Sequence, residues 1–276
     1  MSVSDRIHVA KVAAKREIKS TLYGTGIYIT LTLIFLAVSY FFVNSSVRNV
    51  IDSGVLALRN PITDPFFFSV SLAAAYLGLC SALSISRERD QGTLEVLFYG
   101  PVDAVGYIAA KYLHQMLAFG VMLAFAAVNF FLISQVTNFG FSAGFISALI
   151  LSIFLTSCMV SFGIFLSVST RRMIVSVVLF LGIVLFFFGF AAAYNAVLGI
   201  TARDLPVFII YLRVILDNMN AVIRWVSPIA YFNRGLLAAF MGDAGQYALS
   251  LLSSTVYTVV LLALSVWMFK RKGVRR

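Results

Sequence analysis

A single uncharged stretch limits what this chain can fold into more than any other feature. Between Lys111 and Arg171 there is no Asp, Glu, Lys or Arg. Soluble domains carry about a quarter of their residues as charged side chains. The stretch is also too long for one crossing of a bilayer, which takes about 20 apolar residues. A polar segment at residues 135–140 divides it, so the sequence predicts two membrane-spanning helices near 113–134 and 143–168.

Four further apolar stretches have the length of a membrane span. Hydrophobic residues make up 61% of the chain and charged residues only 12%. These values exclude a soluble globular domain and, because disorder needs low hydrophobicity, a disordered chain. We therefore predict an all-α, polytopic membrane protein whose 276 residues form one transmembrane domain of six helices. The four further spans lie near residues 24–43, 66–86, 173–198 and 247–269.

Lys and Arg residues are unevenly divided between the two sets of flanking segments. Fifteen of the 21 lie in the set that includes both chain ends, and six lie in the other set. Since basic residues collect on the cytoplasmic side, both termini are predicted to be cytoplasmic in a multi-pass protein of the cell membrane. The net charge of +10 then reports topology and not binding of nucleic acid. The basic set is 1–23, 87–111, 171–172 and 270–276; the other is 44–64, 135–142 and 199–243.

The first 23 residues have apolar side chains at helical spacing, with basic residues to one side of the apolar stripe. This pattern predicts an amphipathic helix in the cytoplasmic interface. Two interpretations stay open: the helix binds anionic membrane lipid only, or it also contacts a cytoplasmic partner. The apolar stretch that follows is longer than the core of a signal peptide, so we expect the chain to retain it.

The segment 87–111 between the second and third spans is the most informative part of the sequence. Mixed charges lead into a glycine and a short amphipathic turn that is expected to expose Leu94, Leu97 and Phe98 beside Glu95. Asp103 is placed to cap the helix that becomes the third span. Exposed apolar residues on a short projecting segment predict a docking surface.

The run from Arg87 to Leu113, RERDQGTLEVLFYGPVDAVGYIAAKYL, resembles the signature of type-2 ABC-transporter permeases. Their pattern is a mixed-charge stretch, Gly-Thr-Leu-Glu, a proline, and Gly/Ala-Lys before the third span. Lys111 matches the last position, and Ala110 stands where glycine is frequent. Residues 226–232, followed by Arg234-Gly235, are similar to a segment of gliding-motility and nitrous-oxide-reductase-maturation permeases, with Tyr231 in place of a frequent histidine.

The resemblance implies a half-transporter from a bacterium or archaeon that exports a hydrophobic or amphipathic substrate. It would pair with a second permease copy or homologue and dock separate ABC ATPase subunits, which would hold ATP and Mg. The substrate, and the choice between homodimer and heterodimer, stay open. The implied ATPase-coupling residues are Arg89, Asp90, Gly92, Thr93, Leu94, Glu95, Leu97 and Phe98; the implied outer-gate residues are Ser227, Pro228, Tyr231 and Phe232.

The predicted exterior segment 199–243 contains apolar stretches that are too short to span a membrane. Interfacial or re-entrant helices fit it better. The family resemblance favours short outer helices that narrow an exit, and the alternative is a membrane-hugging loop without a gating role. A machine that drives an external partner protein through this segment, without moving a substrate, is a further alternative.

Several kinds of chemistry have no sequence signature here. The chain has no G-x-x-x-x-G-K-[ST], H-E-x-x-H, G-x-S-x-G or C-x-x-C, so we expect no catalytic residue, cofactor or metal in it. Cys80 and Cys158 are expected to pack as small hydrophobes. No ionisable acid or base lies deep in the predicted spans, which counts against an ion-coupled carrier or channel. Asn129 and Asn195 are expected to form interhelical hydrogen bonds or, alternatively, to line a substrate path.

Overall fold

The computed structural model describes residues 63–94, 103–137, 143–198 and 207–272, together with residues 26, 29, 30, 32, 33 and 40. Regular structure in these residues is helical, with no strand, which confirms the all-α fold class. The seven helices are α4 (Thr63–Asp90), α6 (Ala104–Thr137), α7 (Ala143–Ser169), α8 (Met173–Leu198), α9 (Val207–Val226), α10 (Pro228–Met241) and α11 (Ala244–Lys272).

Five of these helices are long and apolar enough to cross a membrane: α4, α6, α7, α8 and α11. Each overlaps one predicted span, and the chain is a polytopic membrane protein. The predicted helix at 1–23 lies outside the described residues. The predicted span at 24–43 does so too, except for six single positions. A count of six spans therefore stays a prediction.

The helices extend further than the hydropathy pattern predicts. The mixed-charge residues 87–90 continue α4 and do not form a loop, and α6 begins at Ala104, within the segment predicted as the 87–111 loop. Helix formers such as Arg and Glu allow a helix to continue beyond the hydrocarbon core, where their charges are solvated. Of the polar turn predicted at 135–140, residues 135–137 belong to α6 and the rest lies outside the described residues.

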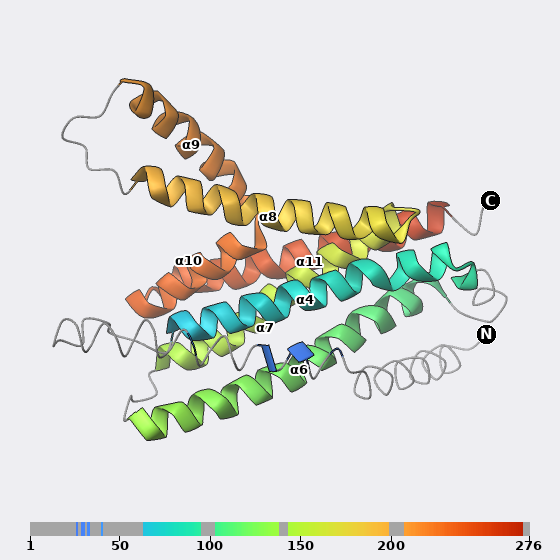
Figure 1. Ribbon diagram of the computed structural model, residues 1–276, viewed down its shortest axis with the longest axis horizontal. Helices are drawn as coiled ribbons and strands as arrows, with labels where there is room; N and C mark the ends of the chain where they lie inside the picture. The colour runs from blue at the N-terminus through green and yellow to red at the C-terminus, as the bar shows by residue number, and fades with distance from the viewer. Residues whose placement is uncertain are drawn as a thin grey trace.

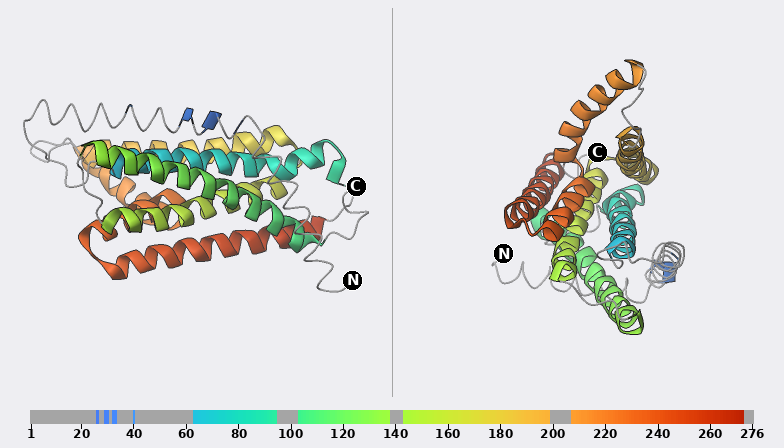
Figure 2. Two further views of the ribbon diagram at one scale, coloured as in Figure 1. Left: turned by 90° about the horizontal axis from the view of Figure 1, so that it is seen from below. Right: turned by 90° about the vertical axis from the view of Figure 1, so that its left-hand side faces the viewer.

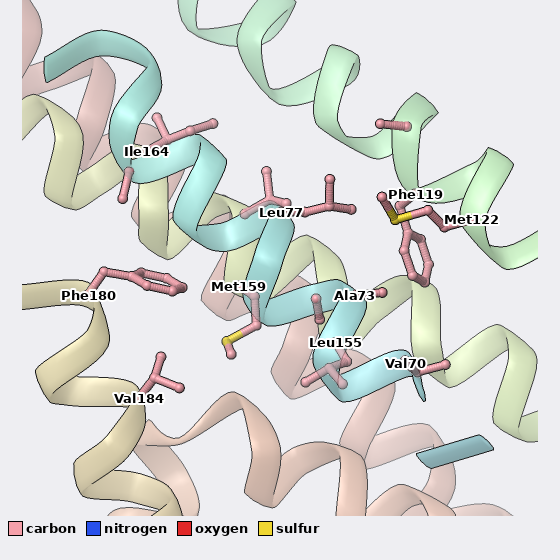
Figure 3. Close-up of a cluster of buried hydrophobic side chains, with 14 of the residues drawn as sticks. Val70, Ala73, Leu77, Phe119, Met122, Leu155, Met159, Ile164, Phe180 and Val184 are labelled. Carbon is pink, nitrogen blue, oxygen red and sulfur yellow. The ribbon is translucent and has the colours of Figure 1, made fainter. Parts of the chain in front are cut away.

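Helix α7 lies at the centre of the bundle, in contact with α4, α6, α8, α10 and α11, and α4 packs along it between α6 and α8 (Figures 1 and 2). Its apolar side chains pack in several directions, as expected for a helix surrounded by other helices. Figure 3 shows α4 side chains between those of α6, α7 and α8. The labelled residues are Val70, Ala73 and Leu77 from α4, Phe119 and Met122 from α6, Leu155, Met159 and Ile164 from α7, and Phe180 and Val184 from α8.

Two glycines bring α4 and α7 close together. A Cβ atom added to Gly163 would lie 2.2 Å from the carbonyl oxygen of Gly78 and 2.9 Å from the Cβ of Ser81. A Cβ added to Gly78 would lie 2.5 Å from the Phe180 ring of α8. Small residues allow such close backbone approach, which favours helix association in a bilayer where hydrophobic burial contributes little.

Serine hydroxyls form hydrogen bonds that join α4 to α7 and to α8. The Ser167 Oγ of α7 accepts hydrogen bonds from the backbone N–H groups of Ile85 and Ser86, at 3.0 and 2.8 Å. The Ser176 Oγ of α8 donates to the carbonyl oxygen of Ala82 at 2.8 Å. Hydrogen bonds of this kind hold neighbouring helices in register and each contributes about 0.6–2 kcal/mol in membranes.

The outward face of α8 is almost entirely apolar. Only Ser176, Phe180, Val184 and Phe190 are buried on this 26-residue helix, and large side chains such as Ile174 and Leu185 are 71% and 67% exposed. An exposed apolar surface of this extent is stable against lipid or another protein and not against water.

Helices α9 and α10 form a hairpin that enters the bundle and leaves again (Figure 1). Tyr231, in the first turn of α10, contacts the ring of Tyr257 at 6.1 Å between centroids. Tyr257 lies thirteen residues inside α11, which corresponds to about 20 Å along that helix. The corner therefore lies about halfway along α11, and the choice between interfacial and re-entrant helices stays a prediction.

We predict that Gly163→Ala lowers the melting temperature of the detergent-solubilised protein. The added methyl must displace the α4 backbone, and overpacking of this kind costs about 1–3 kcal/mol. Gly182→Ala in α8 is the matched control, because an added Cβ there meets nothing within 4 Å. Equal thermal stability of the two variants would contradict the close contact of α4 with α7.

Candidate coupling end and candidate cavity

One end of the bundle, called here the Asp90 end, collects the C-terminal ends of α4, α7 and α11 and the N-terminal ends of α6 and α8 (Figure 2). The predicted coupling residues follow directly from the C-terminal end of α4. Their geometry therefore depends on how firmly this end of α4 is held by its neighbours.

Glu88 joins the end of α4 to the first turns of α6. Its Oε1 lies 2.6 Å from the Nζ of Lys111, and its Oε2 accepts a hydrogen bond from the Tyr107 hydroxyl. Lys111 is 8% exposed, and its ammonium also lies over the Tyr107 ring. A charge buried to this degree needs a partner, so Glu88 and Lys111 stabilise each other in this position. Lys111, which matches the lysine of the permease signature, thus connects α6 to α4.

Arg89 joins the same end of α4 to the C-terminal end of α7. Its Nη1 donates to the carbonyl oxygens of Val168 and Thr170, at 3.2 and 2.8 Å. The last carbonyl groups of a helix have no partner within the helix and carry partial negative charge. A guanidinium satisfies both needs, so Arg89 caps α7 and fixes its distance from α4.

The residues that follow are presented to solvent. Gly92 has a φ of 70°, a left-handed conformation that suits glycine and ends α4. Asp90, Gly92 and Thr93 are exposed, and the Thr93 hydroxyl donates to the carbonyl oxygen of Glu88 at 3.1 Å. This exposed turn, residues 90–93, is the part of the predicted docking segment that the structure describes at the surface.

Leu94 departs from the sequence-based expectation. It was expected to be exposed, but it is 7% exposed and belongs to the hydrophobic core. The turn at Gly92 directs the chain back toward the bundle, so the next apolar side chain is buried. Glu95, Leu97 and Phe98 lie outside the described residues.

The predicted outer-gate residues form the corner between α9 and α10. Ser227 has extended φ and ψ of −82° and 121°, as expected before a proline, and Pro228 opens α10, where its missing N–H breaks no helical bond. The backbone N–H of Ser227 donates to the carbonyl oxygen of Ile223 at 2.8 Å. This bond continues the α9 pattern into the corner, so its backbone is satisfied deep in the bundle.

Tyr231 and Phe232 hold this corner in place. The Tyr231 hydroxyl donates to the carbonyl oxygen of Trp225 at the end of α9. Phe232 is 1% exposed and its ring lies 5.2 Å from that of Phe67 in α4. Both side chains therefore stabilise the hairpin, and of the four predicted residues Ser227 also lines an adjoining cavity.

A cavity of about 520 Å³ lies between the outer half of α8, the hairpin and the start of α11. Phe187, Phe188 and Phe190 of α8 supply an apolar wall. The polar side chains come mostly from the other elements. These are Tyr194, Asn195, Asn220, Arg224, Asn233, Arg234, Asp243 and Gln246.

Arg234 is the most constrained polar group in this cavity. Its Nε donates to Ser250 Oγ at 3.3 Å, and its guanidinium lies over the rings of Trp225 and Tyr231, at 4.9 and 5.6 Å. Its Nη2 is buried and has no hydrogen-bond partner among the described residues. Burial lowers the pKa of Arg234, and Arg224 lowers it further. The group nevertheless stays charged, because a guanidinium does not lose its proton in proteins.

Arg234 was not predicted as a site residue, although Arg234-Gly235 follows the Ser-Pro motif in the sequence. A lone arginine inside an apolar segment was the available signal. Asn195 lines the cavity, which agrees with the second of its two interpretations. Asn129 donates a hydrogen bond to the Phe125 carbonyl of its own helix, and not the interhelical bond that was expected.

A comparison with protein families agrees with the helical layout. A family model described as "ABC-2 family transporter protein" matches residues 14–274, nearly the whole chain. The chain belongs to this ABC-2 transporter family. The protein is therefore a membrane permease subunit of an ABC transporter. A comparison with curated proteins gives no match.

Membership of the ABC-2 family implies which kinds of subunit act with this chain. Permeases of this family act with an ABC ATPase partner and are typically dimeric, and the permease itself is not the catalytic subunit.

We predict that Lys111→Gln lowers the stability of the ABC-2 permease by about 1–3 kcal/mol, because Glu88 then keeps a half-buried charge without its cation. The double variant Glu88→Gln/Lys111→Gln leaves neither charge and should recover part of this loss. Thermal unfolding in detergent measures both. A double variant less stable than Lys111→Gln would contradict mutual stabilisation of the pair.

Proposed function

We propose that this permease forms half of the membrane part of an exporter, which moves a hydrophobic or amphipathic substrate with energy from a separate ABC ATPase. The observation that carries the proposal is the exposed turn at residues 90–93, joined by Glu88 to α6 and by Arg89 to α7. Force applied to this turn acts on three spanning helices at once.

Docking requires a segment that is accessible, and coupling requires one that does not bend. The turn at 90–93 is accessible, and the bonds of Glu88 and Arg89 restrict bending where α4 ends. Closure of two ATPase subunits would then move α4, α6 and α7 as a body, a common form of switching transition. Glu95, Leu97 and Phe98, which follow the buried Leu94, would complete the docking surface.

The distribution of charge supports ATP as the energy source. In the helices long enough to span, Asp, Glu, Lys and Arg occur only toward the ends, with Glu88–Lys111 the pair nearest to the interior. Proton- and ion-coupled carriers usually place such groups near the middle of the membrane. No Walker sequence occurs in the chain, so ATP binding belongs to the partner subunit.

A second permease copy or homologue completes the proposed transporter. The exposed apolar face of α8, with Ile174 and Leu185 among its members, offers surface for lipid and for a second permease. The outer hairpin of each copy would then border the exit for the substrate. In this arrangement the corner at Ser227 and Pro228 moves with α10, which packs on α7 and α11.

Co-purification tests the docking segment. We expect a tagged permease to retain its ABC ATPase when both are expressed together, and the pair Glu95→Arg/Leu97→Arg to reduce retention about tenfold or more. Loss of a central docking contact costs about 2 kcal/mol or more. Arg213→Glu in α9, a charge reversal at the other end of the bundle, is the control. Full retention by the Glu95/Leu97 variant would place docking elsewhere.

A second variant separates docking from coupling. Arg89→Gln removes the guanidinium bonds to the Val168 and Thr170 carbonyls but leaves the exposed turn unchanged. We expect the ATPase to co-purify normally and stimulation of its hydrolysis by the permease to fall several-fold. Arg87→Gln, an exposed neighbour, should keep both properties. Equal stimulation in the Arg87 and Arg89 variants would show that the α4–α7 link does not transmit movement.

A further inference from the structure

The outer cavity contains a cationic pair that the proposed coupling role does not use. Arg224, near the end of α9, and Arg234, in α10, both line it, and both also line an adjoining hollow of about 540 Å³. Within the described residues, neither forms an ion pair. Two guanidinium groups that line the same cavity repel each other, and an anion between them reduces that repulsion.

Arg234 also has a hydrogen-bonding capacity that the described residues leave unfilled. Its buried Nη2 has no partner, while its Nε and its ring contacts fix the plane of the guanidinium beside the cavity. A buried donor without an acceptor is costly, most of all when it is charged. A planar guanidinium held in one orientation suits the oxygens of a phosphate or carboxylate.

The cavity is divided into an apolar and a cationic part. Phe187, Phe188 and Phe190 form one wall, and the other carries Arg224 and Arg234 together with the carboxylate of Asp243, so its charged groups sum to +1. Such a division does not fit a simple ion, which would need no apolar wall. It does fit a molecule with an anionic group at one end and a hydrocarbon chain at the other.

Helix α9 has a polar stripe whose last two members, Asn220 and Arg224, line this cavity, and its apolar side faces outward. The stripe contains Arg213, Asp217, Asn220 and Arg224 at spacings of four and three, and Asp217 accepts a hydrogen bond from Tyr194 of α8 at 2.9 Å. Large apolar residues on other faces are exposed; examples are Phe208, Val214 and Val222. A helix with apolar residues on its outward side and polar residues toward the protein separates lipid on one side from a polar cavity on the other.

The depth of Arg234 matches the phosphate level of a bilayer. Arg234 bonds to Ser250, which lies six residues into α11, or about 9 Å along the helix. The spanning part of α11 has 28 residues and is about 42 Å long. The hydrocarbon core is about 30 Å thick, so a centred helix extends about 6 Å beyond it at each end. Ser250 then lies at the boundary between headgroups and hydrocarbon.

We propose that this cavity binds the phosphate group of an amphiphile, with Arg234 and Arg224 on the phosphate and the hydrocarbon chain against Phe187, Phe188 and Phe190. Arg234, which borders the cavity, and the exposed Arg224 supply the positive charge for the phosphate. The site goes beyond the proposed coupling role, and binding to it requires no ATPase. Failure of the site and failure of ATPase coupling are therefore distinguishable.

Binding to the purified full-length permease, measured by native mass spectrometry, tests the site. The probes are dioctanoyl phosphatidic acid, dioctanoylglycerol, which has the same chains without phosphate, and inorganic phosphate. We expect phosphatidic acid to bind at least about tenfold more tightly than either other probe, because hydrogen bonds to charged groups contribute about 1.5–3 kcal/mol. Equal binding of dioctanoylglycerol would overturn the role of the arginines, and equal binding of inorganic phosphate would overturn the role of the hydrocarbon chain.

Matched variants assign the binding to this cavity. Arg234→Gln and Arg224→Gln should each weaken phosphatidic acid binding about tenfold and leave dioctanoylglycerol binding unchanged. Arg213→Gln removes the same charge from the same helix stripe but lies outside the cavity lining, and it should bind as the unaltered protein does. If Arg234→Gln fails to fold, the exposed Arg224 carries the test. Undiminished binding in Arg224→Gln, or an equal loss in Arg213→Gln, would overturn the proposal.

Discussion

The close approach of α4 to α7 at Gly78 and Gly163 is the constraint on which the rest of the bundle depends. Lipid is as apolar as a leucine side chain, so hydrophobic burial cannot hold these helices together as it would in water. Close backbone contact and hydrogen bonds from hydroxyl groups must do so instead. The bonds at Ser167 and Ser176 lie along the same contacts, and they fix α7 and α8 against α4.

The position of α4 determines what its last turn can do. Glu88 and Arg89 are consecutive residues, but they point to different neighbours, and one holds α6 while the other caps α7. A helix end tied in two directions cannot bend independently of the bundle. This restraint is the physical reason why we propose ATPase coupling at the exposed turn that follows.

The Ser227-Pro228 corner, about halfway along α11, determines how α9 is placed against the bundle. Gly235 lets α10 approach α7 and α11, since an added Cβ would lie 2.8 Å from Leu151 and 3.2 Å from the Cβ of Ser250. The proline corner then directs α9 away from the bundle, and the space between α9 and α8 is the cavity. Its lining is polar where α9 faces inward and aromatic where α8 contributes. The cavity and the coupling end thus belong to one set of packed helices.

The sequence by itself determined the all-α membrane fold and the place of five spans, because a membrane crossing requires about 20 apolar residues. It also singled out the Ser-Pro segment, through a family resemblance, and the structure shows a corner between two helices there. Only the tertiary structure decided that Leu94 is buried, that Arg89 caps α7 and that Arg234 meets Arg224 beside a cavity. These three facts depend on contacts between helices far apart in the chain or across a corner. Hydropathy records the depth of a residue in the membrane, and it does not record which neighbour that residue faces.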